Sequence, residues 1–274
     1  MVDARIDVGQ FRVPPGSKVL LDDHDSNSKA GFEGDKKDGK SALPGLNDYM
    51  SALQKRLWAE SRQKLLVVLQ ATDTGGKDGT IRKVFTGVNP QGVKVHPFGK
   101  PTEEELAHDY LWRIHQHTPA NGQITVFNRS HYEDVLAVRV RELAPRHRWE
   151  RRYHHINEFE LMLAEEGTRI VKVFLNISKE EQGARLESRL DDPAKNWKFS
   201  KDDLDDRVLW DDFREAYEAV LSRTSTEHAP WYVVPANRKW YRNLVVSQIL
   251  IDTLTEMDPQ YPDPESDLDG IVVG

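Results

Sequence analysis

The chain has 274 residues, 38% of them hydrophobic and 30% charged, and its formal net charge is −7. No apolar run approaches the roughly 18 residues that are needed to cross a bilayer, so we expect no membrane protein. The acidic balance argues against a protein that binds nucleic acid over a broad surface, but it is compatible with a local basic channel.

Cysteine is absent from the sequence, which excludes disulfides and thiolate metal sites. Residues 1–13 lack the basic start and the continuous apolar stretch of a secretory signal. We therefore expect a cytoplasmic protein, and the length fits one large α/β domain.

Residues 1–45 come first in chain order and contain a polar stretch, Ser26–Lys40, that is rich in Gly, Lys and Asp. Such a composition does not form a core of its own, so we predict an extension that drapes over the surface. A helical apolar spacing begins at Leu46 and continues through Leu57, and the main domain is therefore predicted over residues 46–274.

Apolar runs then alternate with segments of helical length. The runs predict strands, the first of which is expected to be buried on both faces, at Lys64–Ala71, Val93–Phe98, Ile124–Phe127, Ile170–Ile177 and Trp231–Val234. The segments around them predict helices at Asp78–Thr86, Thr102–His117, Trp149–Glu166, Lys179–Leu190, Leu204–Thr224 and Tyr241–Leu254. This alternation predicts an α/β fold, with a parallel sheet of about five strands, helices on both faces, and a ligand at the carboxyl ends of the strands.

The first predicted strand runs into a glycine-rich loop, Ala71–Thr80, that opens a helix. This order suits a phosphate cradle, in which backbone N–H groups turn toward one anion and Lys77 neutralises an oxygen. The common form GxxxxGK[ST] has Gly at the position of Ala71 and Ser or Thr at the position of Asp78, so the match is imperfect. The other candidate ligands in the loop are Gly75, Gly76, Gly79 and Thr80.

Two carboxylates belong to the same loop. A carboxylate inside an anion cradle repels phosphate unless a cation lies between them, so Asp73 suggests a bound Mg²⁺. Asp78 falls in the first turn of the helix, where the helix dipole favours an acidic residue, and this structural role is the stronger interpretation for it.

Two further motifs follow the loop. The third strand ends in Phe127–Asp134, with the sequence FNRSHYED, and a later helix leads from Arg185 into DDPAKNWK at Asp191–Lys198. With the loop, these motifs resemble those of the second family of polyphosphate kinases, which are polyphosphate-dependent nucleotide phosphotransferases. The resemblance extends from about Phe32 to Tyr261.

The resemblance implies a three-layer P-loop kinase-like fold, a helical lid at about residues 185–205 and a cationic channel for polyphosphate. It implies dependence on Mg²⁺, with Mn²⁺ as an alternative, and a homodimer or homotetramer. It also implies that Asp73 is a catalytic carboxylate linked to the metal, and that Lys77 and Arg129 bind phosphate.

The second motif departs from the pattern of many family members. Those have Asp-Arg-Ser and then Asn-Arg, whereas this sequence has Asn128, Arg129 and Ser130, followed by Glu133 and Asp134. This variant is similar to the subgroup that accepts AMP as well as ADP. Asn128 replaces a carboxylate that could bind the metal directly, and Glu133 or Asp134 would compensate for that loss. Asn128, Glu133 and Asp134 are also predicted contacts to nucleotide or polyphosphate.

Several basic residues are candidate phosphate ligands, each with a plainer alternative. Their sequence context predicts contacts to nucleotide or polyphosphate at Arg82, Lys83, Arg113, Arg185, Arg189, Lys195 and Lys198. Arg82 and Lys83 would otherwise be ordinary helix surface, and Arg113 would pair with Asp109 four residues before it. The segment after Arg189 would otherwise be a solvated charged face with Trp197 in a core.

Arg146, His147, Arg148, Arg151, Arg152, His154 and His155 form a further basic cluster. We interpret this cluster as a solvated helix face, and a site that contacts a polyanion is the less favoured alternative.

The resulting hypothesis is direct transfer of the terminal phosphoryl group of inorganic polyphosphate to AMP or ADP. Adenine nucleotides are the expected acceptors, with guanine nucleotides as an alternative. An ATP-dependent nucleoside monophosphate kinase and a catalytically silent nucleotide-binding module are the competing interpretations, and the choice of donor separates them.

Overall fold

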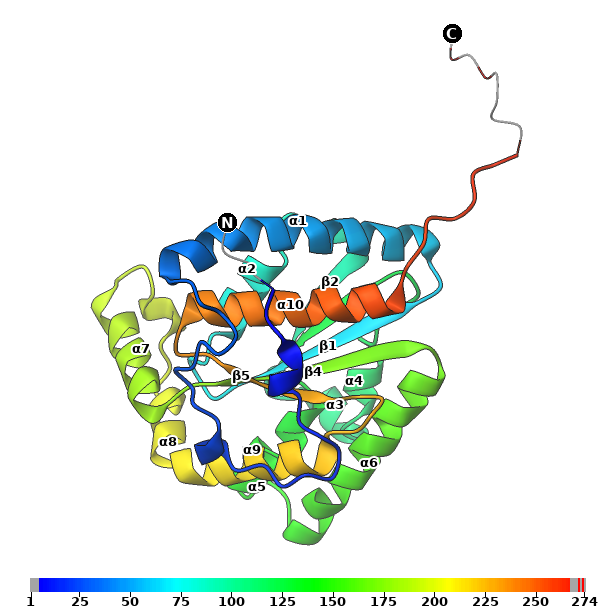
Figure 1. Cartoon of the computed structure of the whole chain (residues 1–274). Coiled ribbons are helices and arrows are strands. Elements are labelled where there is room, and N and C mark those ends of the chain that lie inside the picture. The colour runs from blue at the N-terminus through cyan, green and yellow to red at the C-terminus, as the bar shows by residue number, and fades with distance from the viewer. Residues whose placement is uncertain (1–4, 267–270, 272, 274) are drawn as a thin grey trace.

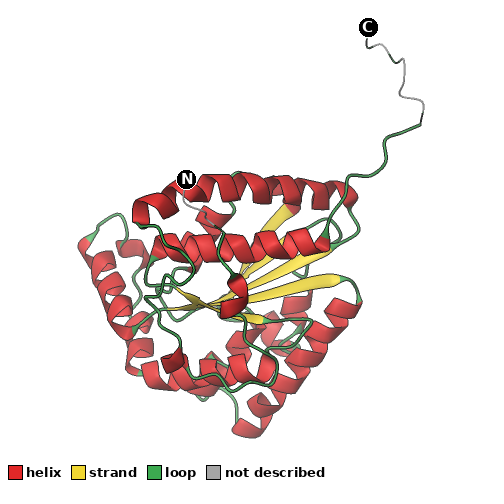
Figure 2. Ribbon diagram, viewed as in Figure 1, coloured by secondary structure: helices red, strands yellow, loops and turns green. Residues whose placement is uncertain are grey.

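A parallel sheet of five strands, in the order β2-β3-β1-β4-β5, forms the centre of the molecule. The computed structural model describes residues 5–266, 271 and 273, and helices cover both faces of the sheet (Figures 1 and 2). The strands are β1 Lys64–Gln70, β2 Val93–Pro97, β3 Ile124–Asn128, β4 Thr168–Asn176 and β5 Trp231–Pro235. The predicted α/β class and the five parallel strands are confirmed.

Two apolar cores, one on each face of the sheet, explain why the inner strand β1 is a continuous hydrophobic run. The edge strand β2 is only partly buried. In β1, Leu65 and Val67 belong to one core, whereas Leu66 and Val68 belong to the other. Burying each such side chain contributes about 1.5–3 kcal/mol to folding. The helices of the first face are α1 Lys36–Glu60, α2 Lys77–Val84 and α10 Lys239–Met257. Those of the second face are α5 Ala137–Val140, α6 Arg146–Glu165 and α9 Trp210–Thr224.

The remaining helices lie near the carboxyl ends of the strands or connect them. They are α3 Glu103–Ala107, α4 Trp112–His115, α7 Lys179–Asp191 and α8 Asp202–Val208, with short 3₁₀ turns η1 Val8–Phe11, η2 Leu21–Asp23, η3 Pro90–Gly92, η4 His131–Asp134 and η5 Asn196–Lys198. No helix among the described residues is both long and apolar enough to cross a membrane.

The first helix begins ten residues before the predicted start at Leu46, so α1 crosses the expected boundary at residue 45. Asp35 caps it, because its side chain accepts hydrogen bonds from the backbone N–H groups of Lys37 and Asp38. Gly39 then lets Trp240 of α10 pack against the helix, since a Cβ at this position would lie 2.3 Å from the indole ring. Capping and packing therefore make a helix of a stretch whose composition predicted none.

Residues 5–35 do drape over the surface, but they are anchored in both cores. Phe11 and Phe32 are buried on the α10 side, and Val19 is buried on the α9 side. Asn237 and Arg238, which precede α10, donate to the carbonyl oxygens of Ser26 and Asn27 at 3.0 and 2.9 Å. The segment therefore supports the start of α10.

One predicted helix, Thr102–His117, is wrong as a single element. The chain forms α3 and α4 instead, because His108 is extended, with ψ at 178°. Asp109 accepts hydrogen bonds from the N–H groups of Leu111 and Trp112, at 2.9 and 3.1 Å, and so begins a new turn. The predicted helix Leu204–Thr224 is likewise divided, into α8 and α9.

Candidate active site

The glycine-rich loop joins β1 to α2 in a conformation that few side chains tolerate. Gly76 caps α2 with φ at 101°, and Thr74 adopts φ at 60°. A Cβ on Gly75 would lie 2.4 Å from that of Ala71. Thr80 is buried and its hydroxyl donates to the carbonyl of Gly76 at 3.1 Å, so the predicted Thr80 ligand supports the loop from inside the helix.

Three charged side chains converge beside this loop. Arg129 donates to a carboxylate oxygen of Asp73 at 2.8 Å, and Lys77 donates to the carbonyl of Ala71 at 3.1 Å. Burial opposes ionisation of Asp73, but Lys77 and Arg129 outweigh it and lower its pKa. Burial, together with the charge of Arg129, lowers the pKa of Lys77. The structure thus brings the predicted catalytic residues Asp73, Lys77 and Arg129 together.

Arg129 itself has a left-handed backbone, with φ at 63°. This conformation costs an arginine roughly 1–2 kcal/mol, so its neighbours must hold it in place. Its N–H donates to the carbonyl of Leu69 at 3.1 Å. The next residue, Ser130, accepts hydrogen bonds from Gln70 at 3.1 Å and from the N–H of Tyr132 at 3.2 Å.

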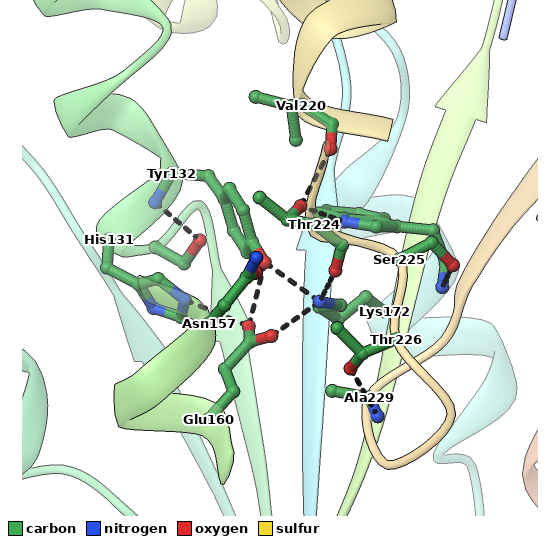
Figure 3. Close-up of polar contacts among 12 residues, drawn as sticks. His131, Tyr132, Asn157, Glu160, Lys172, Val220, Thr224, Ser225, Thr226 and Ala229 are labelled. Atoms are coloured by element: carbon green, nitrogen blue, oxygen red, sulfur yellow. Dashed lines mark hydrogen bonds and ion pairs between the residues drawn. The ribbon is translucent and has the colours of Figure 1, made fainter. Parts of the chain in front are cut away.

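A fully buried polar network anchors the turn η4 that follows (Figure 3). Glu160 of α6 accepts hydrogen bonds from the hydroxyl of Tyr132 at 2.8 Å and from Lys172 of β4 at 2.5 Å. His131 lies 3.1 Å from the same carboxylate. Lys172 donates to the Thr224 carbonyl at 2.6 Å as well. The second motif is therefore fixed to α6, β4 and α9.

A cavity of about 480 Å³, here called the phosphate cavity, lies over the loop. It is lined by Asp73–Gly79, Arg82, Pro97, Phe98, Asn128, Arg129, Arg185, Ser188, Arg189, Lys195, Lys198, Asp203, Lys239 and Arg242. Most of the predicted phosphate ligands therefore meet in one place, at the carboxyl ends of adjacent strands β1 and β3.

Arg185 of α7 contacts the backbone carbonyl groups of the glycine-rich loop. Its guanidinium donates to the carbonyls of Thr74 and Gly75 at 3.0 and 3.1 Å, and Glu181 pairs with it at 2.7 Å. It also donates to the carbonyl of Ala236 at 2.6 Å. These contacts occupy the guanidinium with protein partners, so Arg185 positions the loop.

The predicted lid segment covers one side of the phosphate cavity. Arg189 pairs with Asp203 at 2.9 Å, and Lys198 lies 3.8 Å from Asp78. Trp197 is 78% exposed. The alternative in which Trp197 is part of a core is therefore wrong.

Asp78 also accepts a hydrogen bond from Asn128 at 2.8 Å. The contact joins the first turn of α2 to the end of β3, and it uses the amide that stands where many family members have a carboxylate.

A second cavity, of about 360 Å³ and here called the side cavity, adjoins the first. Both cavities are lined by Asp73, Phe98, Arg129 and Asp203. The walls of the side cavity further include Arg113, Glu133, Asp134, Arg141, Asp206, Trp210, Phe213 and Tyr217. It combines aromatic rings with acidic and basic groups, which suits a nucleoside better than a bare polyanion.

The predicted ligands Arg113, Glu133 and Asp134 lie at the side cavity, not at the phosphate cavity. Arg113 is buried and pairs with Glu105 at 3.2 Å, so the predicted alternative pair with Asp109 is wrong. Asp134 pairs with Arg152 at 2.9 Å, yet burial raises its pKa to about 6.

Asp206 of α8 is a site residue that the sequence did not reveal. Burial and a hydrogen bond with Asp73 raise its pKa to about 6. Arg141 also donates to the carboxylate of Asp206, at 2.5 Å. Two carboxylates in contact favour either a shared proton or a cation between them, so Asp73 and Asp206 could hold a metal ion together.

The third cavity is a groove of about 1030 Å³ between α1, α2 and the start of α10, here called the basic groove. Its lining includes one carboxylate, Asp48, and the cations Lys36, Lys40, Arg82, Lys83, Arg238, Lys239 and Arg242. The groove shares Gly79, Arg82, Lys239 and Arg242 with the phosphate cavity. Basic residues after the last predicted strand, at Arg238, Lys239 and Arg242, were the overlooked sequence signal.

Comparison with known proteins agrees with this arrangement of motifs. The family model described as Polyphosphate kinase 2 (PPK2) matches residues 33–262. The chain belongs to the polyphosphate kinase 2 family. The predicted membership is therefore confirmed, and so is the fold class that it implied.

Similar proteins extend the match over nearly the whole chain. An AMP/ADP-polyphosphate phosphotransferase of Meiothermus ruber is 56% identical over 264 residues, covering 96% of this chain and 99% of the relative. An ADP-polyphosphate phosphotransferase of Rhodopseudomonas palustris is 43% identical, over 94% and 93% of the two chains. The crystal structure of polyphosphate kinase 2 from Arthrobacter aurescens TC1 is 46% identical, with a TM-score of 0.92 over 97% and 94% of the chains.

Proposed function

We propose that this family member transfers the terminal phosphoryl group of inorganic polyphosphate to AMP and to ADP. The observation that carries the proposal is the arrangement of the cavities in series. The phosphate cavity shares lining residues with the basic groove at one end and with the side cavity at the other. A donor chain in the groove and an acceptor nucleotide in the side cavity would meet at Asp73 and Arg129.

The basic groove favours a polymeric donor over ATP. Seven cations and one carboxylate line it, and its volume of about 1030 Å³ exceeds that of either other cavity of the series. A polyanion gains from such a row of cations along its length. The names of the relatives from Meiothermus ruber and Rhodopseudomonas palustris support both acceptors, AMP and ADP.

Direct in-line transfer requires little covalent chemistry from the protein. The attacking phosphate oxygen of AMP or ADP is already ionised at neutral pH, so alignment and charge neutralisation carry the catalysis. Lys77 and the loop N–H groups would hold the donor end, and Arg129 would lie between donor and acceptor. The segment at about residues 185–205 would close over both as a lid and exclude water.

The residues present fit Mg²⁺. The described residues contain no group of three or more His, Cys, Asp or Glu side chains placed to hold a metal ion. Mg²⁺ however needs only one or two carboxylates beside phosphate and water, and Asp73 with Asp206 would provide them. Bound there, Mg²⁺, or Mn²⁺ in its place, would neutralise charge on the transferred group.

Three further properties belong to the proposal. The absence of cysteine in the sequence supports a cytoplasmic enzyme. The family resemblance supports a homodimer or homotetramer. The aromatic rings of the side cavity fit a purine, so guanine nucleotides are a second acceptor class after adenine.

The test is phosphoryl transfer by the purified protein with Mg²⁺ and nucleotide-free polyphosphate, supplied with AMP and ADP separately. ADP and ATP formed from AMP are the expected products, followed by chromatography. Transfer only when ATP is the donor would identify a nucleoside monophosphate kinase instead. Nucleotide binding without transfer from any donor would identify a silent binding module.

A further inference from the structure

Arg242, in the first turn of α10, is a buried cation beside the phosphate-binding loop. The residue is 2% exposed. A Cβ on Gly76 would lie 2.1 Å from one terminal nitrogen of its guanidinium, Nη1, and a Cβ on Gly79 would lie 3.6 Å from the other, Nη2. The guanidinium therefore packs directly against the backbone of the loop and of the first turn of α2.

The charge of Arg242 has no anionic partner in residues 5–266. Nε and Nη2 donate to the neutral side-chain oxygen of Asn243, at 3.2 and 2.9 Å. Nη1 has no hydrogen-bond partner among the residues that the structure describes. Burial and the nearby Arg185 lower the pKa of Arg242 to about 9. An uncompensated buried charge is costly, which is why buried cations in proteins are normally paired.

The groups around Arg242 favour binding of an anion. The helices α2 and α10 both begin here, and neither has a side-chain cap to satisfy its first N–H groups. Lys239 and Arg82 line the same walls, and Arg242 contributes to both the phosphate cavity and the basic groove. Arg185 differs, because Glu181 and backbone carbonyls already satisfy it.

We propose that Arg242 forms a separate phosphate subsite at the junction of the phosphate cavity and the basic groove, where an inner phosphate of an oligophosphate chain supplies the missing anion. This inference rests on the proposed function only in naming the donor chain as the ligand. It assigns Arg242 to binding of the chain and not to the reacting group, which lies at Asp73 and Arg129.

The subsite has a thermodynamic signature that activity alone would not show. Without ligand, Arg242 leaves a charge unpaired, so Arg242→Met is expected to unfold at a temperature equal to or above that of the wild type. With long-chain polyphosphate and no nucleotide, the wild type gains stability by mass action, whereas Arg242→Met gains less.

The experiment measures thermal unfolding and calorimetric binding of long-chain polyphosphate by four proteins: the wild type, Arg242→Met, Arg242→Gln and Arg223→Met. Arg223 lies on the opposite face of the sheet, where it pairs with Glu150 at 2.6 Å, and it controls for loss of one positive charge. We expect Arg242→Met to bind polyphosphate about 10- to 100-fold more weakly than the wild type. Arg223→Met should bind like the wild type.

Each result decides between the possibilities. Binding by Arg242→Met as tight as that of the wild type would overturn the subsite and leave the proposed function intact. If Arg242→Met does not fold, Arg242→Gln, which keeps a donor toward Asn243, is judged by the same criterion. A wild type that neither binds polyphosphate nor uses it as donor would overturn the proposed function together with the subsite.

Discussion

Lys172 and Arg242 are both buried cations, but they lie on opposite faces of the sheet and have opposite surroundings. Lys172 is fully buried and donates to Glu160, to the Tyr132 hydroxyl and to the Thr224 carbonyl, at 2.5, 2.9 and 2.6 Å (Figure 3). Arg242 is almost as buried, and its hydrogen bonds go to one neutral amide. Lys172 is paired with a carboxylate of the chain, whereas Arg242 has no anionic partner within the described part of the chain.

The difference separates a structural charge from one that awaits a ligand. The network around Lys172 fixes Tyr132, which lies three residues beyond Arg129 in the chain. That network holds the segment that follows Arg129, whose own backbone is strained, in place without any ligand. Arg242 instead places a buried positive charge without a nearby anion next to the loop, and a bound phosphate chain would supply that anion.

The largest effect is expected when the buried ion pair between Lys172 and Glu160 is broken. Lys172→Met removes the lysine cation that pairs with the buried carboxylate of Glu160, so the free energy of unfolding should fall by about 3–5 kcal/mol. Urea unfolding followed by circular dichroism measures it. The double variant Lys172→Met/Glu160→Gln removes both charges and should recover at least half of the loss. A loss under about 1 kcal/mol in the single variant would show that Lys172 is not the stabilising partner.

A second test concerns the ion pair of Asp73 and Arg129, which is more exposed than either Lys172 or Arg242. Their side chains are 14% and 42% exposed, so the pair is partly solvated. Asp73→Asn should lower kcat with polyphosphate and AMP at least about 100-fold, because it removes the carboxylate assigned to Mg²⁺. The free energy of unfolding should change by no more than about 1 kcal/mol. Full activity in this variant would refute the metal assignment.

The smallest effect is expected at Asp78, whose charge is open to solvent. The side chain is 69% exposed and lies 3.8 Å from Lys198. Asp78→Asn should therefore change the free energy of unfolding by less than about 0.5 kcal/mol and kcat by less than about threefold. Steady-state kinetics at saturating polyphosphate check this prediction. A tenfold loss of kcat would instead make Asp78 a ligand of the reacting groups.

The sequence predicted the elements whose burial is continuous. The inner strand β1 is an almost uninterrupted apolar run, because a parallel strand covered on both faces has no polar side to alternate with. The edge strand β2, with the sequence VKVHP, is only partly buried and carries two polar residues. It also predicted Asp73, Lys77 and Arg129, since residues that follow neighbouring parallel strands meet at one edge. These predictions depended on local pattern, on strand order and, for the roles of the three residues, on the family resemblance.

The features that the sequence did not reveal depend on tertiary contacts. The start of α1 is stabilised by packing of Trp240 against Gly39, which no local composition shows. The basic residues after the last strand were visible, but whether Arg242 has a partner depends on segments far apart in the chain. Asp206 became a site residue only because the fold brings α8 beside Asp73.

The basic groove also bears on how a polymer would move. Phosphate units along a chain are identical, and a lining of seven cations with one carboxylate distinguishes none of them from the next. Such a surface would attract a polyphosphate chain into the groove but would not fix its position along the groove. After one terminal unit is consumed, the shortened polymer presents the same face to the groove one step further in. Under the proposed function, this wall would favour repeated use of one polymer molecule over its release after every turnover.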